Sequence, residues 1–408
     1  MTQIFAVLIS FSFIPLLSKT KLKLSYILLI TAGSLAVTSG IGIEAARESV
    51  LNVFIESSSL NTILTVMMVS ILGGLMKYYK ILEKIVETIM NIICNKKNIL
   101  VIIPAVIGVL IIPGGALLSA PFINDIGEEM NIPSGRRAAI NLVFRHIAMF
   151  ILPYSTGLLV ISATIPDISI PRLVVFNLFY VIPMLIIGYL LYIKNIKSEN
   201  LLLRKNIGIN VYKLALYTSP IYICVIINAI TGLPFYITMI ASVFIVYLLG
   251  DKNDFLRITC KSLNWQIVLM VITVLLMKEI ILKMDGLLLI FSNMFNESNN
   301  MISILIIFLI FSIFFGYITG NQTAALAIIL PMISQLDISL EMMHIYIYFS
   351  FVSTFIGYFF SPIHLCQAFT IHLMNVSTSE LYKEYKLYAP IMLLLLFVSV
   401  FILKLLFA

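Results

Sequence analysis

Long apolar segments separated by short polar segments run through the whole chain. A helix of about 20 apolar residues crosses a hydrocarbon core of ~30 Å. Helices also pair their own backbone N–H and C=O groups, as hydrocarbon requires. The pattern predicts ten crossings, near residues 3–18, 24–40, 60–77, 138–163, 172–193, 213–230, 234–249, 265–283, 341–371 and 387–406.

Two further apolar segments are interrupted in their middle by a short polar sequence. The segment 99–130 contains PGG at 113–115, and the segment 301–333 contains TGN at 319–321. Glycine and proline end or bend helices there, so each segment is predicted to turn back as a re-entrant hairpin. The alternative is a kinked but continuous and well-packed helix, because both residues are common in membrane helices.

Each interruption is followed, about forty residues later, by a second predicted helix break, at Pro153 and at SP in positions 361–362. The distances from 113 to 319 and from 153 to 362 are 206 and 209 residues, so the pattern occurs twice. Matched broken segments of this kind indicate a transporter built from repeats, with its binding site at the breaks.

Five crossings in each half are an odd number, so the second half must enter the membrane in the opposite orientation. The expected fold is therefore an all-α polytopic membrane protein, an inverted repeat of two five-span halves that each contain a re-entrant hairpin and a broken helix. We assign 1–195 to the first repeat, 196–212 to a polar linker and 213–408 to the second repeat. Charged stretches at 44–57 and 251–264 are predicted to be interfacial helices.

Composition supports a membrane location. Hydrophobic residues make up 61% of the chain, charged residues 11%, and the mean hydropathy is +1.08, whereas soluble domains carry roughly 25% charged residues. With the N-terminus outside, 20 of the 26 basic residues fall in cytoplasmic loops and Arg145 falls within a span. The five outer residues are Arg47, Arg172, Lys278, Lys283 and Lys404. This asymmetry predicts that both termini are extracytoplasmic. The richness in Ile, Lys and Asn suggests a prokaryote, so the expected location is the prokaryotic inner (cell) membrane.

The same residues argue against other classes. The net charge of +7 reports membrane orientation, and no nucleic-acid partner is expected. An enzyme is not expected either, because the chain has no HExxH or GxSxG motif and no paired intramembrane aspartates. Neither a metal site nor a disulfide framework is expected, because the cysteines are scattered, at Cys94, Cys224, Cys260 and Cys366.

The first interruption offers backbone groups to a ligand. A helix that begins after Gly114 and Gly115 would point its free N–H groups into the membrane, where they favour an anion. Pro113 lacks an N–H group, and Ser119 adds a hydroxyl. We therefore name Gly114, Gly115 and Ser119 as substrate-binding candidates and Pro113 as an ion-coupling candidate.

The second interruption carries several polar side chains within a few residues. Burying such groups without partners costs kilocalories each. Hydrogen bonds to neighbouring helices would satisfy them, but their number favours a ligand and a coupling ion. The substrate-binding candidates here are Thr319, Gly320, Asn321, Gln322 and Thr323, and Thr319 and Asn321 are also ion-coupling candidates.

Four polar residues accompany the broken spans. Arg145 could hold a carboxylate with its planar guanidinium, or it could extend to the lipid headgroups near Arg136 and Arg137. Its neighbour His146 could carry a proton, or be a hydrogen-bonded structural histidine. Ser361 and His364 lie beside the second break and are substrate-binding candidates. His364 is also a candidate for ion coupling, the alternative being a packing histidine.

The motifs PGGALLSAP at 113–121, FRH at 144–146, TGNQTA at 319–324 and SPIHLC at 361–366 resemble those of a prokaryotic integral-membrane family of unknown function. That family belongs to the ion transporter superfamily, which includes divalent-anion/sodium symporters and carriers of citrate, gluconate and lactate. The resemblance implies homodimers, a scaffold domain and a mobile, elevator-type transport domain. PGGALLSAP and TGNQTA stand where the divalent-anion symporters carry paired Ser-Asn-Thr tips.

Together these observations predict a secondary active transporter of a small organic anion, a carboxylate, with Na+ or H+ as the possible coupling ion and no other cofactor. Its expected partners are the anionic substrate, membrane lipid and a second copy of the chain. A cation/proton antiporter is the alternative, since broken helices also build such sites. It needs a carboxylate in the middle of the membrane, and Asp125, Asp337 and Glu341 all map near interfaces.

Overall fold

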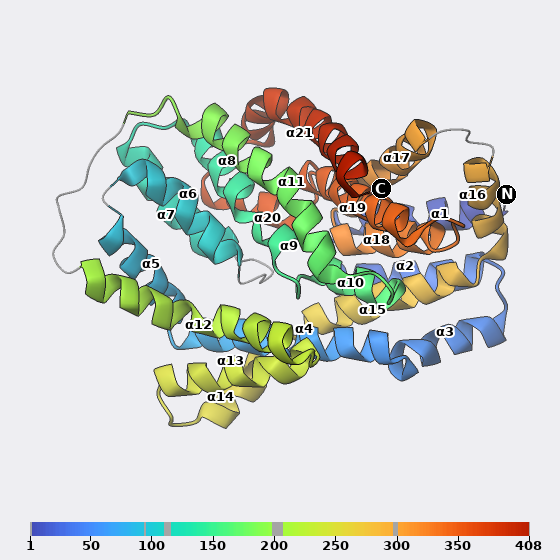
Figure 1. Ribbon diagram of the computed structural model, residues 1–408, viewed down its shortest axis with the longest axis horizontal. Coiled ribbons are helices and arrows are strands. Elements are labelled where there is room, and N and C mark those ends of the chain that lie inside the picture. The colour runs from blue at the N-terminus through green and yellow to red at the C-terminus, as the bar shows by residue number, and fades with distance from the viewer. Residues whose placement is uncertain (1, 94, 110–115, 198–206, 297–300, 408) are drawn as a thin grey trace.

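The computed structural model describes residues 2–93, 95–109, 116–197, 207–296 and 301–407, and these residues form helices without a β-strand (Figure 1). The first half contains α1 (Thr2–Leu17), α2 (Leu24–Thr38), α3 (Ile43–Ile55), α4 (Ser57–Tyr78), α5 (Ile81–Ile92), α6 (Lys96–Gly108), α7 (Ala116–Glu129), α8 (Ser134–Arg145), α9 (Ala148–Ile151), α10 (Thr156–Thr164) and α11 (Ile170–Gly188), which continues as the π-helix Tyr189–Ile193. The second half contains α12 (Ile207–Thr231), α13 (Phe235–Leu249), α14 (Phe255–Ser262), α15 (Trp265–Leu282), α16 (Asp285–Asn296), α17 (Met301–Thr319), α18 (Gln322–Ile333), α19 (Leu340–Phe359), α20 (Leu365–Leu373) and α21 (Thr378–Phe407).

Eight helical segments in the described residues are long and apolar enough to cross a membrane, which confirms the all-helical, multi-pass class. The correspondence with the ten predicted crossings is incomplete. Helices α1, α2 and α13 have only 16, 15 and 15 residues, so α13 is about 22 Å long at 1.5 Å per residue. Conversely, α17, predicted to be one arm of a hairpin, has 19 residues and is itself long enough to cross.

Two helices lie where no element was predicted. Residues 81–92 were interpreted as part of a basic cytoplasmic loop, but they form α5. Its apolar residues Leu82, Ile85, Val86 and Ile89 are buried and recur with helical spacing, which explains the helix. Residues 285–296 form α16 in the second half. The predicted interfacial stretches also contain helices, α3 and α14.

The predicted helix breaks in the described residues are present. Residues 152–155 separate α9 from α10, and residues 360–364 separate α19 from α20. Residues 320–321 separate α17 from α18, and Gly320 has φ of +56°, a left-handed conformation that glycine adopts readily. Pro113, Gly114 and Gly115 lie outside the described residues, between α6 and α7.

Close packing of α17 against α19 positions the second broken helix, which is formed by α19 and α20. A Cβ atom on Gly316 of α17 would lie 2.9 Å from the backbone N of Tyr358 in α19. A Cβ atom on Gly357 of α19 would lie 2.9 Å from the Cα of Ile313 in α17. The backbones of the two helices therefore touch through this pair of glycines, a packing mode of membrane helices. It fixes the end of α19 from which the break starts.

The half-helices occupy the interior of the molecule. In Figure 1, α9 and α10 lie between α6, α7 and α8 on one side and α15 and α18 on the other, and α20 lies close to α7 and α8. Helices α4, α12, α13 and α14 line the lower edge of the same view. The breaks of both halves therefore come together inside the helical assembly.

Candidate functional site

A cavity of about 140 Å³ lies where the broken helices meet. Its wall is formed by both halves of the chain, from Leu24 and Gly108 in the first half to Leu365 and Cys366 in the second. Much of the wall is apolar, with Met149, Ile267 and Met270 as examples. The polar lining is confined to a few groups, as is usual for small-molecule sites.

Three helix N-termini face this cavity. Thr156 is the first residue of α10, Gln322 is the first residue of α18, and Leu365 is the first residue of α20, and all three line the wall. The first N–H groups of a helix have no partner within the helix, and the helix dipole adds partial positive charge at that end. Three such ends around one cavity favour an anionic ligand.

Arg145 supplies the formal positive charge. It is the last residue of α8, lines the cavity and is only 5% exposed. The sequence left two roles open for Arg145, binding of a carboxylate and extension to the lipid headgroups. Extension to the headgroups requires an exposed guanidinium, whereas this one is buried inside the protein. The nearby Arg136 and Arg137 instead pair with carboxylates at the surface, Glu384 and Glu128, each at 3.3 Å.

Asn321 organises the tip between α17 and α18. Its Oδ1 accepts hydrogen bonds from the Ala324 backbone N at 3.0 Å and from Thr323 Oγ1 at 2.6 Å, which caps α18. Its Nδ2 donates to the sulfur of Met270 at 3.3 Å. Thioether sulfur is a weak acceptor, so this amide can turn a donor toward a ligand at small cost.

Gln322 brings a buried acceptor to the same wall. Its Nε2 donates to the backbone O of Phe351 at 2.9 Å, which holds the side chain in place. Its Oε1 is buried and has no hydrogen-bond partner in the part of the chain that the structure describes. A buried acceptor is expected to find a donor or a cation. A ligand hydroxyl or a coupling ion would satisfy it.

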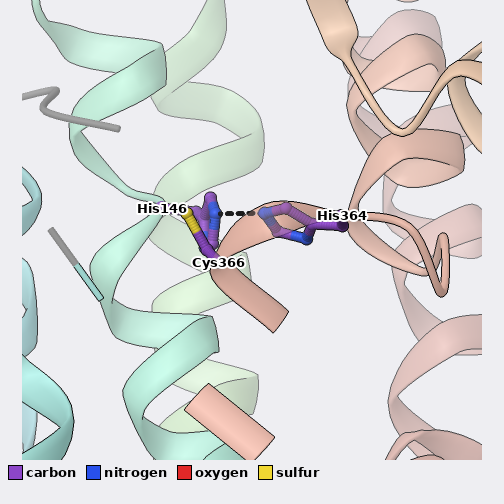
Figure 2. A group of neighbouring side chains, drawn as sticks. All are labelled: His146, His364 and Cys366. Atoms are coloured by element: carbon purple, nitrogen blue, oxygen red, sulfur yellow. Dashed lines mark hydrogen bonds between the residues drawn. The ribbon is translucent and has the colours of Figure 1, made fainter. Parts of the chain in front are cut away.

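Two imidazoles meet at the inner end of the cavity (Figure 2). His146 Nε2 and His364 Nε2 lie 3.3 Å apart, and His146 Nδ1 lies 2.6 Å from the backbone O of Leu142. The His146 ring packs edge-on against Phe359 with centroids 5.4 Å apart, and the His364 ring lies 4.0 Å from that of Tyr358. Both imidazoles are therefore held in fixed orientations.

The structure gathers most of the predicted site residues in its described part around this cavity. Those that line the wall are Arg145, Gly320, Asn321, Gln322 and Thr323. His364 reaches the wall through His146. Thr319 and Ser361 lie just behind it, where their hydroxyls hydrogen-bond to the backbone O of Asn321 at 2.9 Å and of Tyr317 at 2.6 Å.

Four predicted site residues of the first interruption remain. Ser119 is buried in α7 and is not part of the wall. Gly114, Gly115 and Pro113 lie outside the described residues. The structure adds Thr156, Tyr358 and Cys366, which were not predicted as site residues. A new helix begins shortly after Pro153 and after Pro362. Comparison of the residues that follow the two prolines could therefore have identified Thr156.

Two other cavities lie in the described part of the protein. One, of about 540 Å³, lies beside Pro153, Asn61 and Asn228 and contains no charged residue among its lining. The other, of about 210 Å³, contains Lys77 and shares Thr156 and Ile267 with the candidate site. It lies directly beside the site.

The sequence matches one protein family along almost its entire length. Residues 3–404 match the family described as "Protein of unknown function (DUF401)". The chain belongs to this family. No curated protein matches it.

Proposed function

We propose that this member of the DUF401 family is a secondary active transporter of a small organic anion, a carboxylate, coupled to Na+ or H+. The observation that carries the proposal is the convergence of Arg145 and the N-termini of α10, α18 and α20 on one cavity. Anions are stabilised by such N-termini and by a guanidinium, which can bind a carboxylate through two hydrogen bonds. The apolar remainder of the wall suits the carbon skeleton of an organic acid.

Helix order supports the inverted repeat that the proposal requires. If α2, α4, α7 and α10 correspond to α13, α15, α18 and α20, neighbours in one half should have matching neighbours in the other. Helix α4 packs against α13, and α15 packs against α2. Helix α10 packs against α18, and α20 packs against α7. Exchange of neighbours in this way is expected of two repeats related by a pseudo-two-fold axis.

The second cavity supplies a route to the site. It is lined by Lys77, in the last turn of α4, and by Thr156 and Ile267, which it shares with the anion cavity. Lys77 belongs to the loops assigned to the cytoplasm by their positive charge. We infer that the anion leaves or enters on this side, with both chain termini on the other. The elevator-type movement, the homodimer and the place in the ion transporter superfamily rest on the resemblance of the sequence motifs.

The cation/proton antiporter remains the second candidate because of one residue that the sequence reading overlooked. Glu279 of α15 is a carboxylate within a membrane span and is 2% exposed. Its carboxylate contacts Lys278 Nζ, and its Oε2 accepts a hydrogen bond from Asn52 Nδ2 at 3.2 Å. It does not line the anion cavity. Its ion pair accounts for its burial without a transported cation.

The proposal is tested with purified protein in detergent, screened against small organic acids by thermal shift with and without sodium. Acids that stabilise the protein are then tested as substrates in proteoliposomes, with a sodium or proton gradient. A transporter of organic anions should show uptake that one of the gradients drives. Proton or cation flux in the complete absence of an organic anion would instead support the antiporter.

Variants of the polar tip localise the site. Asn321→Ala and Thr323→Ala should each lower substrate affinity by about 5- to 150-fold, since each removes part of a buried hydrogen-bond network, worth roughly 1–3 kcal/mol. Thr218→Ala serves as the control, because the Thr218 hydroxyl bonds within α12, to the backbone O of Leu214 at 2.7 Å. Unchanged affinity and uptake in both tip variants would place the site elsewhere.

A further inference from the structure

His146, His364 and Cys366 form a cluster that the anion cavity does not explain (Figure 2). Their side-chain nitrogen and sulfur atoms all lie within 4.8 Å of one another. His146 follows the end of α8, whereas His364 and Cys366 stand at the start of α20. The two imidazoles are 3% and 1% exposed. Side chains of these types ligate transition metals, and residues far apart in sequence have been brought together here.

The backbone contacts of the two Nδ1 atoms orient the imidazole rings so that their Nε2 atoms face each other. The Nδ1 of His146 lies 2.6 Å from the backbone O of Leu142, and the Nδ1 of His364 lies 3.5 Å from the backbone O of Phe359. A carbonyl oxygen only accepts hydrogen bonds, so the short contact of His146 places the hydrogen atom on its Nδ1 and the lone pair on its Nε2. The two Nε2 atoms face each other across 3.3 Å, so either a hydrogen atom on His364 Nε2 or a cation between the rings satisfies the lone pair of His146. A metal ion or a proton between the two nitrogens would stabilise this contact.

The spacing of the two nitrogens suits a tetrahedral metal ion. With Zn–N bonds of about 2.0–2.1 Å, two nitrogens of a tetrahedron lie roughly 3.3–3.4 Å apart. The observed separation of 3.3 Å agrees with this edge. The two backbone carbonyls would act as the partners that commonly orient metal-bound imidazoles. The sulfur of Cys366 lies within 4.8 Å of both nitrogens.

The surroundings decide which ions fit. The cluster has nitrogen and sulfur ligands and no carboxylate, which disfavours Mg²⁺ and Ca²⁺ and favours Zn²⁺ or Cu+. The thiolate of Cys366 would neutralise Cu+ and leave one positive charge on Zn²⁺. His146 and Cys366 both line the anion cavity, so the fourth position of a tetrahedral ion would open toward it. Three protein ligands with an open fourth position are typical of zinc sites that bind a further molecule.

We propose that His146, His364 and Cys366 form a binding site for a thiophilic transition-metal ion, Zn²⁺ or Cu+, at the inner end of the anion cavity. The site joins the residue that follows α8, in the fourth predicted span, to the start of α20, at the break in the ninth. A bound ion would therefore cross-link the two halves of the protein at the cavity.

Metal binding is measured on the purified full-length protein in detergent, without any organic anion. After incubation with Zn²⁺, or with Cu+ under reducing conditions, and removal of unbound metal, one ion per chain is expected by elemental analysis. The metal retained identifies the preferred ion. Co²⁺ in place of Zn²⁺ should give a sulfur-to-cobalt charge-transfer band, which reports the bond to Cys366 directly.

Conservative variants keep the test independent of folding. Cys366→Ser should lose the cobalt–sulfur band and weaken metal binding at least about tenfold, and His364→Gln should weaken it similarly. Cys260→Ser is the matched control, because Cys260 is exposed and remote from the cluster. Gel filtration of each variant shows whether it remains folded. Absence of bound metal in the wild type, or equal binding by Cys366→Ser, would overturn the proposal and leave a proton as the bridge between the imidazoles.

Because the anion is omitted, failure of metal binding leaves the transport proposal intact. Conversely, a protein that binds one metal ion but no organic acid would retain the metal site and lose the proposed transport function.

Discussion

Replacement of Gly320 by alanine should destabilise the protein through two separable effects. Gly320 has φ of +56°, and a residue with a Cβ atom pays roughly 1–2 kcal/mol in this region. The added Cβ would also lie 2.6 Å from Ile363 Cγ1 and 3.1 Å from the Ile363 backbone C and O. Ordinary contacts begin near 3.4 Å, so the backbone before α20 must move by a few tenths of an ångström. Overpacking of this kind costs about 1–3 kcal/mol.

The two effects together amount to roughly 2–5 kcal/mol. At about 2 °C per kcal/mol, the apparent Tm of the purified protein in detergent should fall by roughly 4–10 °C. Because Ile363 precedes His364, the displacement also moves the N-terminus of α20, and affinity for the anion and for the metal should both fall. Thermal unfolding and ligand titration of the same preparations measure the two consequences.

Two further variants separate the causes. Gly33→Ala is the control, because Gly33 lies in α2 with nothing within 4 Å of an added Cβ, and this substitution should leave the Tm unchanged or slightly raised. Gly320→Ala combined with Ile363→Ala removes the side-chain clash but keeps the backbone strain. It should therefore be less destabilised than the sum of the two single variants. If Gly320→Ala behaved like Gly33→Ala, the argument for a strained, tightly packed tip would be wrong.

Three other predictions concern charged residues and the membrane topology that the charges indicate. Arg145→Lys keeps the positive charge but loses the planar pair of donors, so anion affinity in titrations should fall about tenfold, whereas unchanged affinity would exclude Arg145 from the binding site. Lys278 and Glu279 are both 2% exposed and form an ion pair. Lys278→Met should therefore lower the free energy of unfolding by about 3–5 kcal/mol, because it leaves the Glu279 carboxylate buried without its partner. Adding Glu279→Gln to this variant should recover part of the lost Tm. If the Tm losses of the two single variants simply added in the double variant, the pairing would be refuted. For topology, an impermeant thiol reagent applied to intact cells should label a cysteine introduced at Ile41 but not one at Asn200, and rapid labelling of the latter would invert the assignment.

The sequence by itself determined the membrane class and the positions of the helix breaks in the described residues. Composition decides the solvent, because 61% hydrophobic residues cannot be buried by a chain with 11% charged residues in water. Proline and glycine act locally, through the missing N–H group and the left-handed backbone. The breaks near Pro153, Gly320 and Pro362 could therefore be placed from the sequence.

Tertiary structure decided which of the polar residues share a cavity. His146 and His364 are 218 residues apart in sequence, and Cys366 carries no metal-binding spacing that would associate it with either. Their meeting depends on the packing of α8 against α20 and of the His146 ring against Phe359 of α19, which no local pattern encodes. Ser119 illustrates the converse, because it lies beside a predicted helix start but is buried in α7 and does not line the cavity. Local chemistry fixes where the chain bends, whereas packing between the two halves fixes what the bends enclose.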